Sequence, residues 1–342
     1  MSRRNIAALV AMLALGIGIF WYELRATNLQ QLTHDLTHLN FWWLGVAALC
    51  MGLYWLFEAF VVKVLLKKRV EKFSLKNALR IPLVEQLFNS ITPFSSGGQP
   101  AQLVALMQSG IDGGRASSLL LMKFVVFQAM VLINFILTLV FGFHLVAAKF
   151  TYLAWLVVFG FIMHLTVIAG LLMVMYWYNF TKKLVHLCLR PLKLFMKAER
   201  VAKIKEQLDH KIDNFYAESL RIKRDTKTIV VASLLTFIQL IFYYSVPYFV
   251  LLSLGLNKTN FFEVLVMHIM IVMIISLFPI PGGSGGAELS FKALFATFIT
   301  SNSKLVLAMI LWRVMTYYLG MFIGMFAMVV KPDKVVELED QT

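Results

Sequence analysis

The chain has 342 residues, of which 60% are hydrophobic and 15% are charged, and its formal net charge is +14. A soluble domain is nearer half apolar and a quarter charged, so the composition argues against a soluble enzyme or binding module. The basic residues lie in short blocks beside apolar runs, as in membrane proteins, and no zinc-finger or RNP motif accompanies them. We therefore expect no nucleic-acid partner.

Apolar runs long enough to cross a bilayer recur from one end of the chain to the other. They predict an all-α polytopic membrane protein whose single transmembrane domain comprises residues 1–342. The first run follows Arg3 and Arg4 and has no small-residue cleavage site after it, so we interpret it as an uncleaved span. The six predicted full spans are 5–22, 41–62, 116–142, 152–178, 229–254 and 304–330.

The distribution of basic residues predicts the orientation of these spans. Residues 63–80 hold seven Lys and Arg against one acid, and residues 181–227 hold thirteen against six. By the positive-inside rule, both loops and both termini should lie in the cytoplasm. Within 181–227, apolar residues recur at helical spacing, and two interpretations stay open: an amphipathic helix on an anionic leaflet, or a connector helix packed on the spans. These residues are Val201, Ile204, Leu208, Ile212 and Phe215.

Two further stretches, 81–110 and 261–300, each consist of an apolar run, a Pro/Gly break and a second apolar run. At membrane depth such a break is tolerated only inside protein or beside a water-filled cavity, because its backbone groups lack helical partners. The half-helix ends leave free N–H groups and a positive dipole that suit an anion such as phosphate. The flanking loops have opposite predicted sides, so we predict two re-entrant hairpins that enter from opposite faces.

A weak internal repeat relates the two stretches. At one constant offset, a Pro and two Gly of the first align with a Pro and two Gly of the second: Pro93, Gly97 and Gly98 with Pro281, Gly285 and Gly286. This pattern is typical of an inverted-topology transporter. The alternative is that each break is a kinked helix or an ordinary loop. If 261–278 crosses the membrane fully, the predicted topology changes and the two stretches no longer form an inverted repeat.

Three stretches occur in a familiar order: FNSITPFSSGGQPAQL, FPIPGGSGGAEL and LWRVMTYYLG. They resemble the lysylphosphatidylglycerol synthase transmembrane-region family, the flippase-like membrane part of the bacterial multiple peptide resistance factor. The resemblance covers about residues 5–330. It implies a stand-alone protein of the bacterial cell membrane that moves phosphatidylglycerol or its lysyl ester between leaflets and so contributes to lipid metabolism and antibiotic resistance.

The resemblance also implies partners. Twelve residues follow the last predicted span, so we expect no acyltransferase domain in this chain and a separate lipid-modifying synthase as a partner. Membrane phospholipids are the expected ligands, and a homo-oligomer stays open. A name such as phosphatidylglycerol lysyltransferase would then apply only through the shared membrane domain.

Charged side chains inside apolar runs are costly and therefore mark candidate functional sites. Glu58 and Glu85 are candidates for proton or ion coupling, whereas Lys123 should snorkel to the cytoplasm. The structural alternative has Glu288 capping a helix, Arg313 in an ion pair and Glu58 at the interface. The predicted lipid-binding residues are Glu85, Asn89, Pro93, Gly97, Gly98, Gln99, Gln102, Pro281, Gly282, Gly283, Gly285, Gly286, Glu288, Arg313 and Tyr317.

The sequence contains no GxSxG, HExxH, Walker or CxxC pattern. Its two cysteines, Cys50 and Cys188, cannot form a disulfide framework. We therefore predict no catalytic residue, metal or cofactor, and interpret the scattered histidines His144, His164 and His268 as core or interface residues. Two alternative functions remain: an ion-coupled transporter of a small solute, and a membrane component related to the lysyltransferase.

Overall fold

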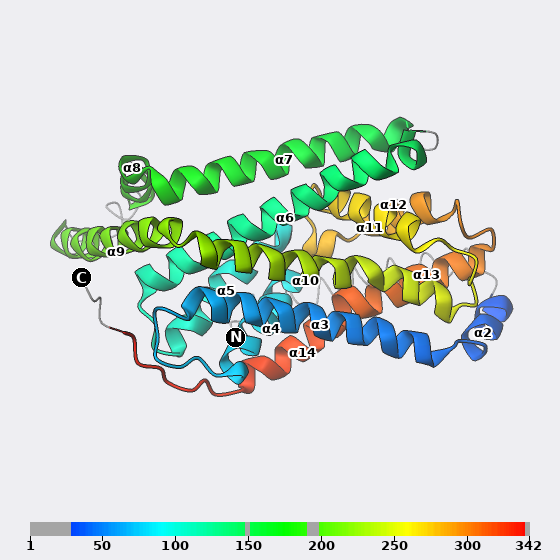
Figure 1. Cartoon of the computed structure of the whole chain (residues 1–342), viewed down its shortest axis with the longest axis horizontal. Coiled ribbons are helices and arrows are strands. Elements are labelled where there is room, and N and C mark those ends of the chain that lie inside the picture. Colours follow the sequence, from blue (N-terminus) through cyan, green and yellow to red (C-terminus); the bar gives the residue numbers. More distant parts are fainter. Residues whose placement is uncertain (1–28, 148–150, 190–197, 339–342) are drawn as a thin grey trace.

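The computed structural model describes residues 29–147, 151–189 and 198–338, and its regular elements in this part of the chain are all helices (Figure 1). This confirms the predicted all-α class. In chain order the α-helices are α2 Leu29–Thr37, α3 Phe41–Leu66, α4 Leu75–Ile91, α5 Gly98–Gln108, α6 Gly113–Ala147, α7 Thr151–Tyr176, α8 Tyr178–Leu189, α9 Ala198–Arg224, α10 Thr226–Ser253, α11 Phe261–Ile275, α12 Gly286–Phe295, α13 Asn302–Arg313 and α14 Leu319–Val329.

Five helical segments of the described residues are long and apolar enough to cross a membrane. They agree with the predicted spans to within a few residues, because each long apolar run forms one continuous helix. The predicted span 5–22 lies outside the described residues. The five segments are Phe41–Leu66, Gly113–Phe141, Trp155–Tyr176, Thr226–Ser253 and Asn302–Val329.

Each predicted hairpin is a pair of packed helices joined by a short 3₁₀ turn, α4 and α5 by η1 (Pro93–Ser95), and α11 and α12 by η3 (Pro281–Gly283). The two turns have the same backbone conformation at aligned positions. Phe94 and Ser95 have φ values of 53° and 52°, and Gly282 and Gly283 have 63° and 62°. Both second helices also begin at aligned glycines. The repeat in the sequence is thus also a repeat in the backbone.

The two hairpins approach from opposite ends of the molecule, and η1 contacts η3 between them (Figure 1). Helix α11 has 15 residues and extends only about 22 Å at about 1.5 Å per residue, less than a hydrocarbon core of about 30 Å. Its length favours a segment that stops partway. The re-entrant arrangement therefore remains a prediction that agrees with this geometry.

Hairpin α4–α5 is held against the last span by a close helix crossing at Gly324. A Cβ atom on Gly324 would lie 2.5 Å from the backbone oxygen of Leu83 and 2.8 Å from Cβ of Leu87. Gly324→Ala is therefore expected to lower the melting temperature in detergent, because overpacking costs about 1–3 kcal/mol and exceeds the gain of about 1 kcal/mol in helix propensity.

The matched control for this substitution is Gly52→Ala in α3, where an added Cβ meets no atom within 4 Å. The control should melt at or above the temperature of the wild type. Equal melting temperatures for the two variants would contradict the close crossing.

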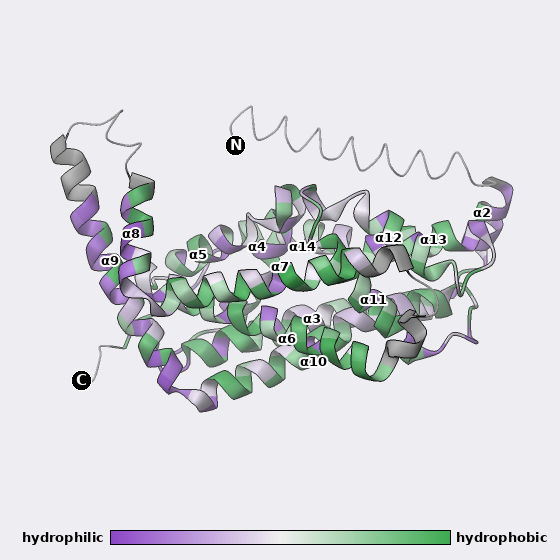
Figure 2. Ribbon diagram, turned by 90° about the horizontal axis from the view of Figure 1, so that it is seen from above, coloured by the Kyte–Doolittle hydropathy of each residue, from purple (hydrophilic) through white to green (hydrophobic). Residues whose placement is uncertain are grey.

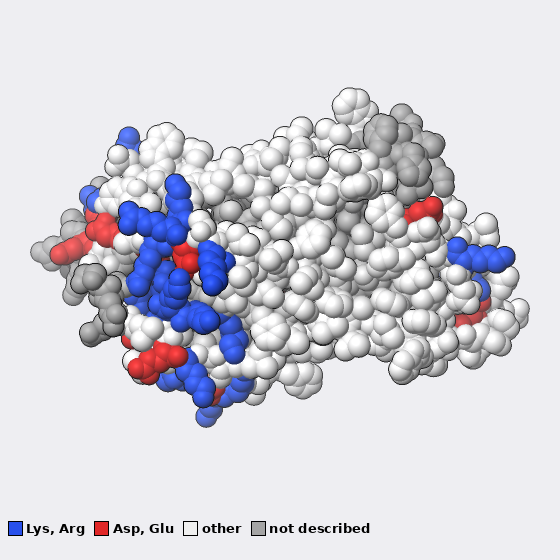
Figure 3. Space-filling model, in the orientation of Figure 1, with Lys and Arg blue, Asp and Glu red and all other residues white. Residues whose placement is uncertain are grey.

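Basic residues gather at one end of the molecule, and the middle of the face in Figure 3 carries no charge. The helix pair α8 and α9 projects from the bundle at that end, and Figure 2 shows hydrophilic residues concentrated on it. Ile212 and Phe215 of α9 are buried, and α9 packs on α6, which supports a packed connector over these residues. Leu208 is half-buried, and the side chains of Val201 and Ile204 lie outside the described residues.

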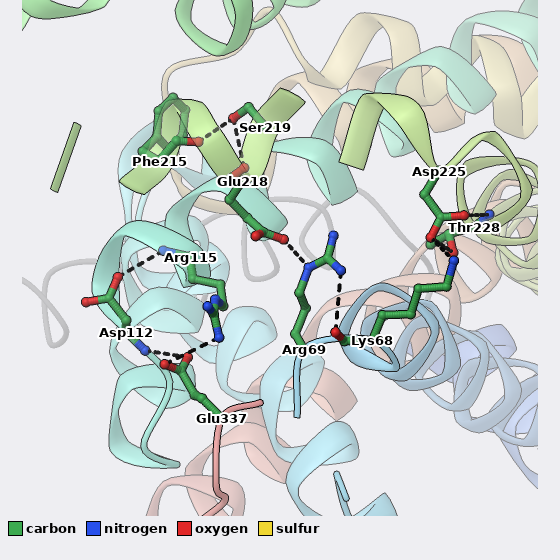
Figure 4. A network of polar contacts seen from close by, with 11 residues as sticks. Lys68, Arg69, Asp112, Arg115, Phe215, Glu218, Ser219, Asp225, Thr228 and Glu337 are labelled. Carbon is green, nitrogen blue, oxygen red and sulfur yellow. Dashed lines mark hydrogen bonds and ion pairs between the residues drawn. The ribbon is translucent and has the colours of Figure 1, made fainter. Parts of the chain in front are cut away.

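Ion pairs tie α9 and the C-terminal segment to this basic end (Figure 4). Arg69 pairs with Glu218 of α9, and both side chains are buried. Lys68 Nζ lies 2.6 Å from Asp225, the N-cap of α10, and its hydrogen bond lowers the pKa of that carboxyl. Glu337 contacts the start of α6 through Arg115 at 3.5 Å.

Glu218→Ala is expected to destabilise the protein by about 3–5 kcal/mol, because it leaves the guanidinium of Arg69 buried without its carboxylate. Thermal melting in detergent measures the loss. Glu206→Ala on the exposed side of the same helix is the control. Since an apolar pair can replace a buried ion pair, Arg69→Met combined with Glu218→Leu should recover most of the stability. A wild-type melting temperature for Glu218→Ala would refute the pairing.

Candidate functional site

Three charged side chains from three helices meet inside the bundle. Lys123 Nζ on α6 contacts Glu58 Oε1 on α3 and lies 3.0 Å from Glu85 Oε2 on α4. Glu58 and Lys123 are only 3% and 6% exposed. The prediction that Lys123 snorkels to the cytoplasm is therefore wrong, because its ion pairs hold the side chain inside the bundle, where Glu58 is buried as well. We call Glu58, Glu85 and Lys123 the carboxylate–lysine cluster.

Side-chain amides surround the two carboxylates. Gln102 Nε2 on α5 contacts Glu85 and also lies 3.4 Å from Glu58 Oε1. Gln239 Nε2 on α10 donates to Glu58 Oε2 at 3.3 Å, and two further amides lie 3.4 Å from Oε1 of Glu85. The two carboxylates are thus held by donors from four helices, α4, α5, α6 and α10. The four amides belong to Asn89, Gln99, Gln102 and Gln239.

A cavity of about 610 Å³ lies beside the cluster, between the two hairpins and α7. Its walls differ in chemistry. Glu58, Glu85 and Lys123 form part of a polar wall from α3, α4 and α6. The opposite wall, from α7, α11 and the second break, is largely apolar and includes Met163, Val167, Val272, Ile275 and Phe278. Such a cavity fits an amphipathic ligand better than a uniformly polar one.

A smaller cavity of about 240 Å³ adjoins the first and shares wall residues with it. It contains Arg313, whose Nε lies 2.6 Å from Glu288 Oε1 and whose Nη1 donates to the backbone oxygen of Gly282 at 2.9 Å. The guanidinium carbon also lies 5.2 Å from the ring centroid of Tyr317. The shared wall residues are Tyr54, Gln86, Asn89, Ser95, Phe127, Val272 and Ile275.

A π-helical turn, η4 (Val314–Tyr318), directly follows Arg313 and interrupts the last span. π-Turns inside α-helices are frequent at functional sites. Here the turn carries Tyr317, whose hydroxyl donates to the backbone oxygen of Ser90 on α4 at 2.8 Å. A Cβ atom on Gly282 would clash with the Tyr317 ring, so the second break requires glycine at this contact. Tyr317 therefore joins the last span to both hairpins.

The sequence predicted free backbone N–H groups at the breaks, but three of these groups donate to side chains of the same hairpin. Gly97 N donates to Thr92 Oγ1 at 2.8 Å, and Gly98 N donates to Asn89 Oδ1 at 3.0 Å. Gly285 N donates to Glu288 Oε2 at 2.6 Å. Glu288 therefore caps its helix and pairs with Arg313 at the same time. An anion would meet side chains here rather than these three amides.

The structure places half of the predicted site residues in the walls of the two cavities. The larger cavity is lined by Glu58, Glu85, Asn89, Gln99 and Gly283. The smaller is lined by Asn89, Gly282, Arg313 and Tyr317. Two act through a neighbour in a cavity wall, Gln102 through Glu85 and Glu288 through Arg313. Besides Gln102 and Glu288, the predicted residues that line neither cavity are Pro93, Gly97, Gly98, Pro281, Gly285 and Gly286.

Several cavity residues were not predicted from the sequence, and two of them, Lys123 and His164, are titratable and belong to the larger cavity. Lys123 carries a charge inside an apolar run, a signal that was noted, but its partners lie far away in the sequence. His164 is a histidine in an apolar helix, buried and in the wall of the larger cavity, and no local pattern distinguishes it from a core histidine. His268 is such a core histidine, since it bonds Trp312 and the backbone of Tyr244. The side chain of His144 lies outside the described residues.

The chain is similar to known membrane proteins over most of its length. A UPF0104 membrane protein of Archaeoglobus fulgidus is 26% identical over 294 residues, which cover 83% of this chain and 85% of that relative. A family model described as "Lysylphosphatidylglycerol synthase TM region" matches residues 8–324, a range that contains both hairpins and both cavities. The protein is therefore a membrane protein that belongs to the lysylphosphatidylglycerol synthase transmembrane-region family.

Proposed function

We propose that this protein moves a phospholipid between the two leaflets of the cell membrane. The observation that carries the proposal is the pair of adjoining cavities where the two helix breaks meet, of which the larger has one polar and one apolar wall. A phospholipid headgroup needs polar partners, whereas the glycerol and upper acyl chains need apolar contact. The two walls supply both.

The smaller cavity favours a phosphate-bearing headgroup. Arg313 presents a guanidinium there, and guanidinium binds phosphate through parallel hydrogen bonds. The family's description makes phosphatidylglycerol and its lysyl ester the first lipids to test. In this proposal the basic end of the molecule faces the cytoplasm, as positive-inside orientation requires.

Helix α7 favours a lipid over a small soluble substrate. Only 17% of its apolar window is buried, and Trp155, Phe159 and Ile162 are exposed. The helix thus forms a thin wall between the larger cavity and surrounding lipid. Movement of this wall would open the cavity sideways, so that acyl chains remain in the bilayer while the headgroup crosses.

The test is a leaflet assay in proteoliposomes. Fluorescent phosphatidylglycerol, labelled on an acyl chain, and its lysyl ester are placed in both leaflets, and an impermeant quencher reports the accessible fraction over time. The proposal predicts that the protected fraction falls faster than in empty vesicles. If these two lipids and phosphatidylethanolamine all remain protected as in empty vesicles, the proposed function is wrong.

A further inference from the structure

We propose that His164 and the carboxylate–lysine cluster together form a proton-exchange site in the larger cavity, and that proton binding there drives lipid movement. The role of the proton in lipid movement rests on the proposed function, whereas the proton-exchange site stands on the arrangement of the side chains alone.

The first argument is the charge of the cluster. Glu58 and Glu85 are two carboxylates, and Lys123 is the one cation that reaches them among the described residues. Lys123 Nζ and Gln102 Nε2 each contact both carboxylates, so the two acids share donors in a small buried space. Acids this close cannot both ionise without a further positive charge, so they titrate as one coupled pair. A single proton supplies the missing charge.

The second argument is an unsatisfied polar side chain. His164 is 7% exposed and lines the larger cavity, yet neither ring nitrogen has a hydrogen-bond partner among the described residues. Gln102 Oε1, beside the carboxylates, also lacks one. A buried imidazole without partners is unfavourable unless water or a ligand in the cavity hydrogen-bonds to its nitrogens. Imidazole is the side chain that exchanges protons most readily near neutral pH.

The backbone holds His164 in place from one helical turn away. A Cβ atom on Gly160 would lie 2.5 Å from the backbone oxygen of Met273, so α7 crosses α11 in close contact there. His164 therefore lies on α7 in the wall of the larger cavity, which Glu58, Glu85 and Lys123 also line.

Few other titratable groups compete for this role. Tyr54 of α3 lines the larger cavity beside the cluster, whereas α5 contributes Gln99 and α11 contributes Val272 and Ile275, none of which is titratable. The adjoining cavity adds Tyr243 and Tyr244 of α10, together with Arg313 and Tyr317 of the last span. Arg313 is already paired with Glu288 and cannot neutralise the cluster without breaking that pair.

The first experiment detects the proton without using transport. Infrared difference spectra of purified protein in lipid nanodiscs are recorded while the pH is changed. The wild type should show the C=O band of a protonated carboxylic acid, which is lost as the pH rises. Glu58→Gln and Glu85→Gln should each remove this band, and His164→Gln should shift its titration midpoint. Exposed residues of α9 supply the controls Glu206→Gln and His210→Gln, which should leave the band and its midpoint unchanged.

Three results would overturn the proton site. The wild type could show no titrating carboxylic acid band, the band could survive both glutamine variants, or its midpoint could stay unchanged in His164→Gln. Displacement of the band by Na⁺ at constant pH would identify a metal-cation site instead and would also overturn the proposal.

The second experiment separates the proton site from the proposed function. With one proton moved per lipid, an imposed difference of about one pH unit should shift the steady-state leaflet ratio by up to about tenfold. His164→Gln should abolish this shift. If lipid crosses at the same rate and to the same ratio with and without the gradient, coupling is wrong and the proposed function stands. If the infrared band titrates while no lipid crosses, the proton site stands and the proposed function is wrong.

Discussion

Lys123→Met is expected to abolish lipid movement and to lower the free energy of unfolding by about 3–5 kcal/mol. The substitution removes the cation that contacts both Glu58 and Glu85, so two carboxylates are left buried without a counter-charge. Methionine preserves most of the side-chain length, so lost packing contributes little. Thermal melting in detergent and the leaflet assay measure the two effects on the same preparation.

Compensating substitutions separate stability from function in this prediction. Lys123→Met combined with Glu58→Gln and Glu85→Gln removes all three charges, so the triple variant should melt close to the wild type but remain inactive. Lys183→Met, at an exposed position on α8, is the control and should behave as the wild type in both assays. Wild-type melting and wild-type lipid movement in Lys123→Met would show that the cluster has neither role.

Arg313→Lys should reduce the rate of lipid movement at least about tenfold, since one lost charge-assisted hydrogen bond is worth about 1.5–3 kcal/mol. The guanidinium bonds Glu288 through Nε and the backbone of Gly282 through Nη1. A lysine ammonium keeps the charge but lacks the planar fork that reaches both acceptors and a phosphate at once. The retained charge avoids the unpaired Glu288 that an alanine substitution would create.

The outcome for Arg313→Lys is read against two controls. Arg224→Lys, exposed at the end of α9, should leave the rate unchanged. Melting curves should show that Arg313→Lys loses only a few degrees, so that a slow rate reports function rather than misfolding. A wild-type rate in Arg313→Lys would show that lipid movement does not depend on the planar guanidinium of Arg313.

The spans and breaks were predictable because their causes are local. A long apolar run forms a helix wherever it lies, and α10 begins and ends within a few residues of the predicted span 229–254. The paired Pro and Gly positions also predicted the second helix of each hairpin. The match between the two turns includes one position where the first turn has no glycine. Phe94 adopts the positive φ of its counterpart Gly282, although this conformation favours glycine.

The internal geometry of the site was not predictable because its causes are distant in the sequence. Lys123 finds its carboxylates on α3 and α4, and no local spacing relates these helices. The free amides expected at the breaks are capped by Asn89, Thr92 and Glu288, whose side chains fold back within each hairpin. The π-helical turn after Arg313 likewise depends on packing against the hairpins rather than on a sequence signal.

The central claim is that a phospholipid headgroup occupies the cavities where the two helix breaks meet. Photolabelling tests it most directly: the protein is reconstituted with a phospholipid that carries a photoreactive group on its headgroup, irradiated, and digested for mass spectrometry. Labels are expected on half-buried cavity residues such as Phe124 and Phe127. Labels confined to outward-facing residues such as Trp155 and Phe326 would contradict it.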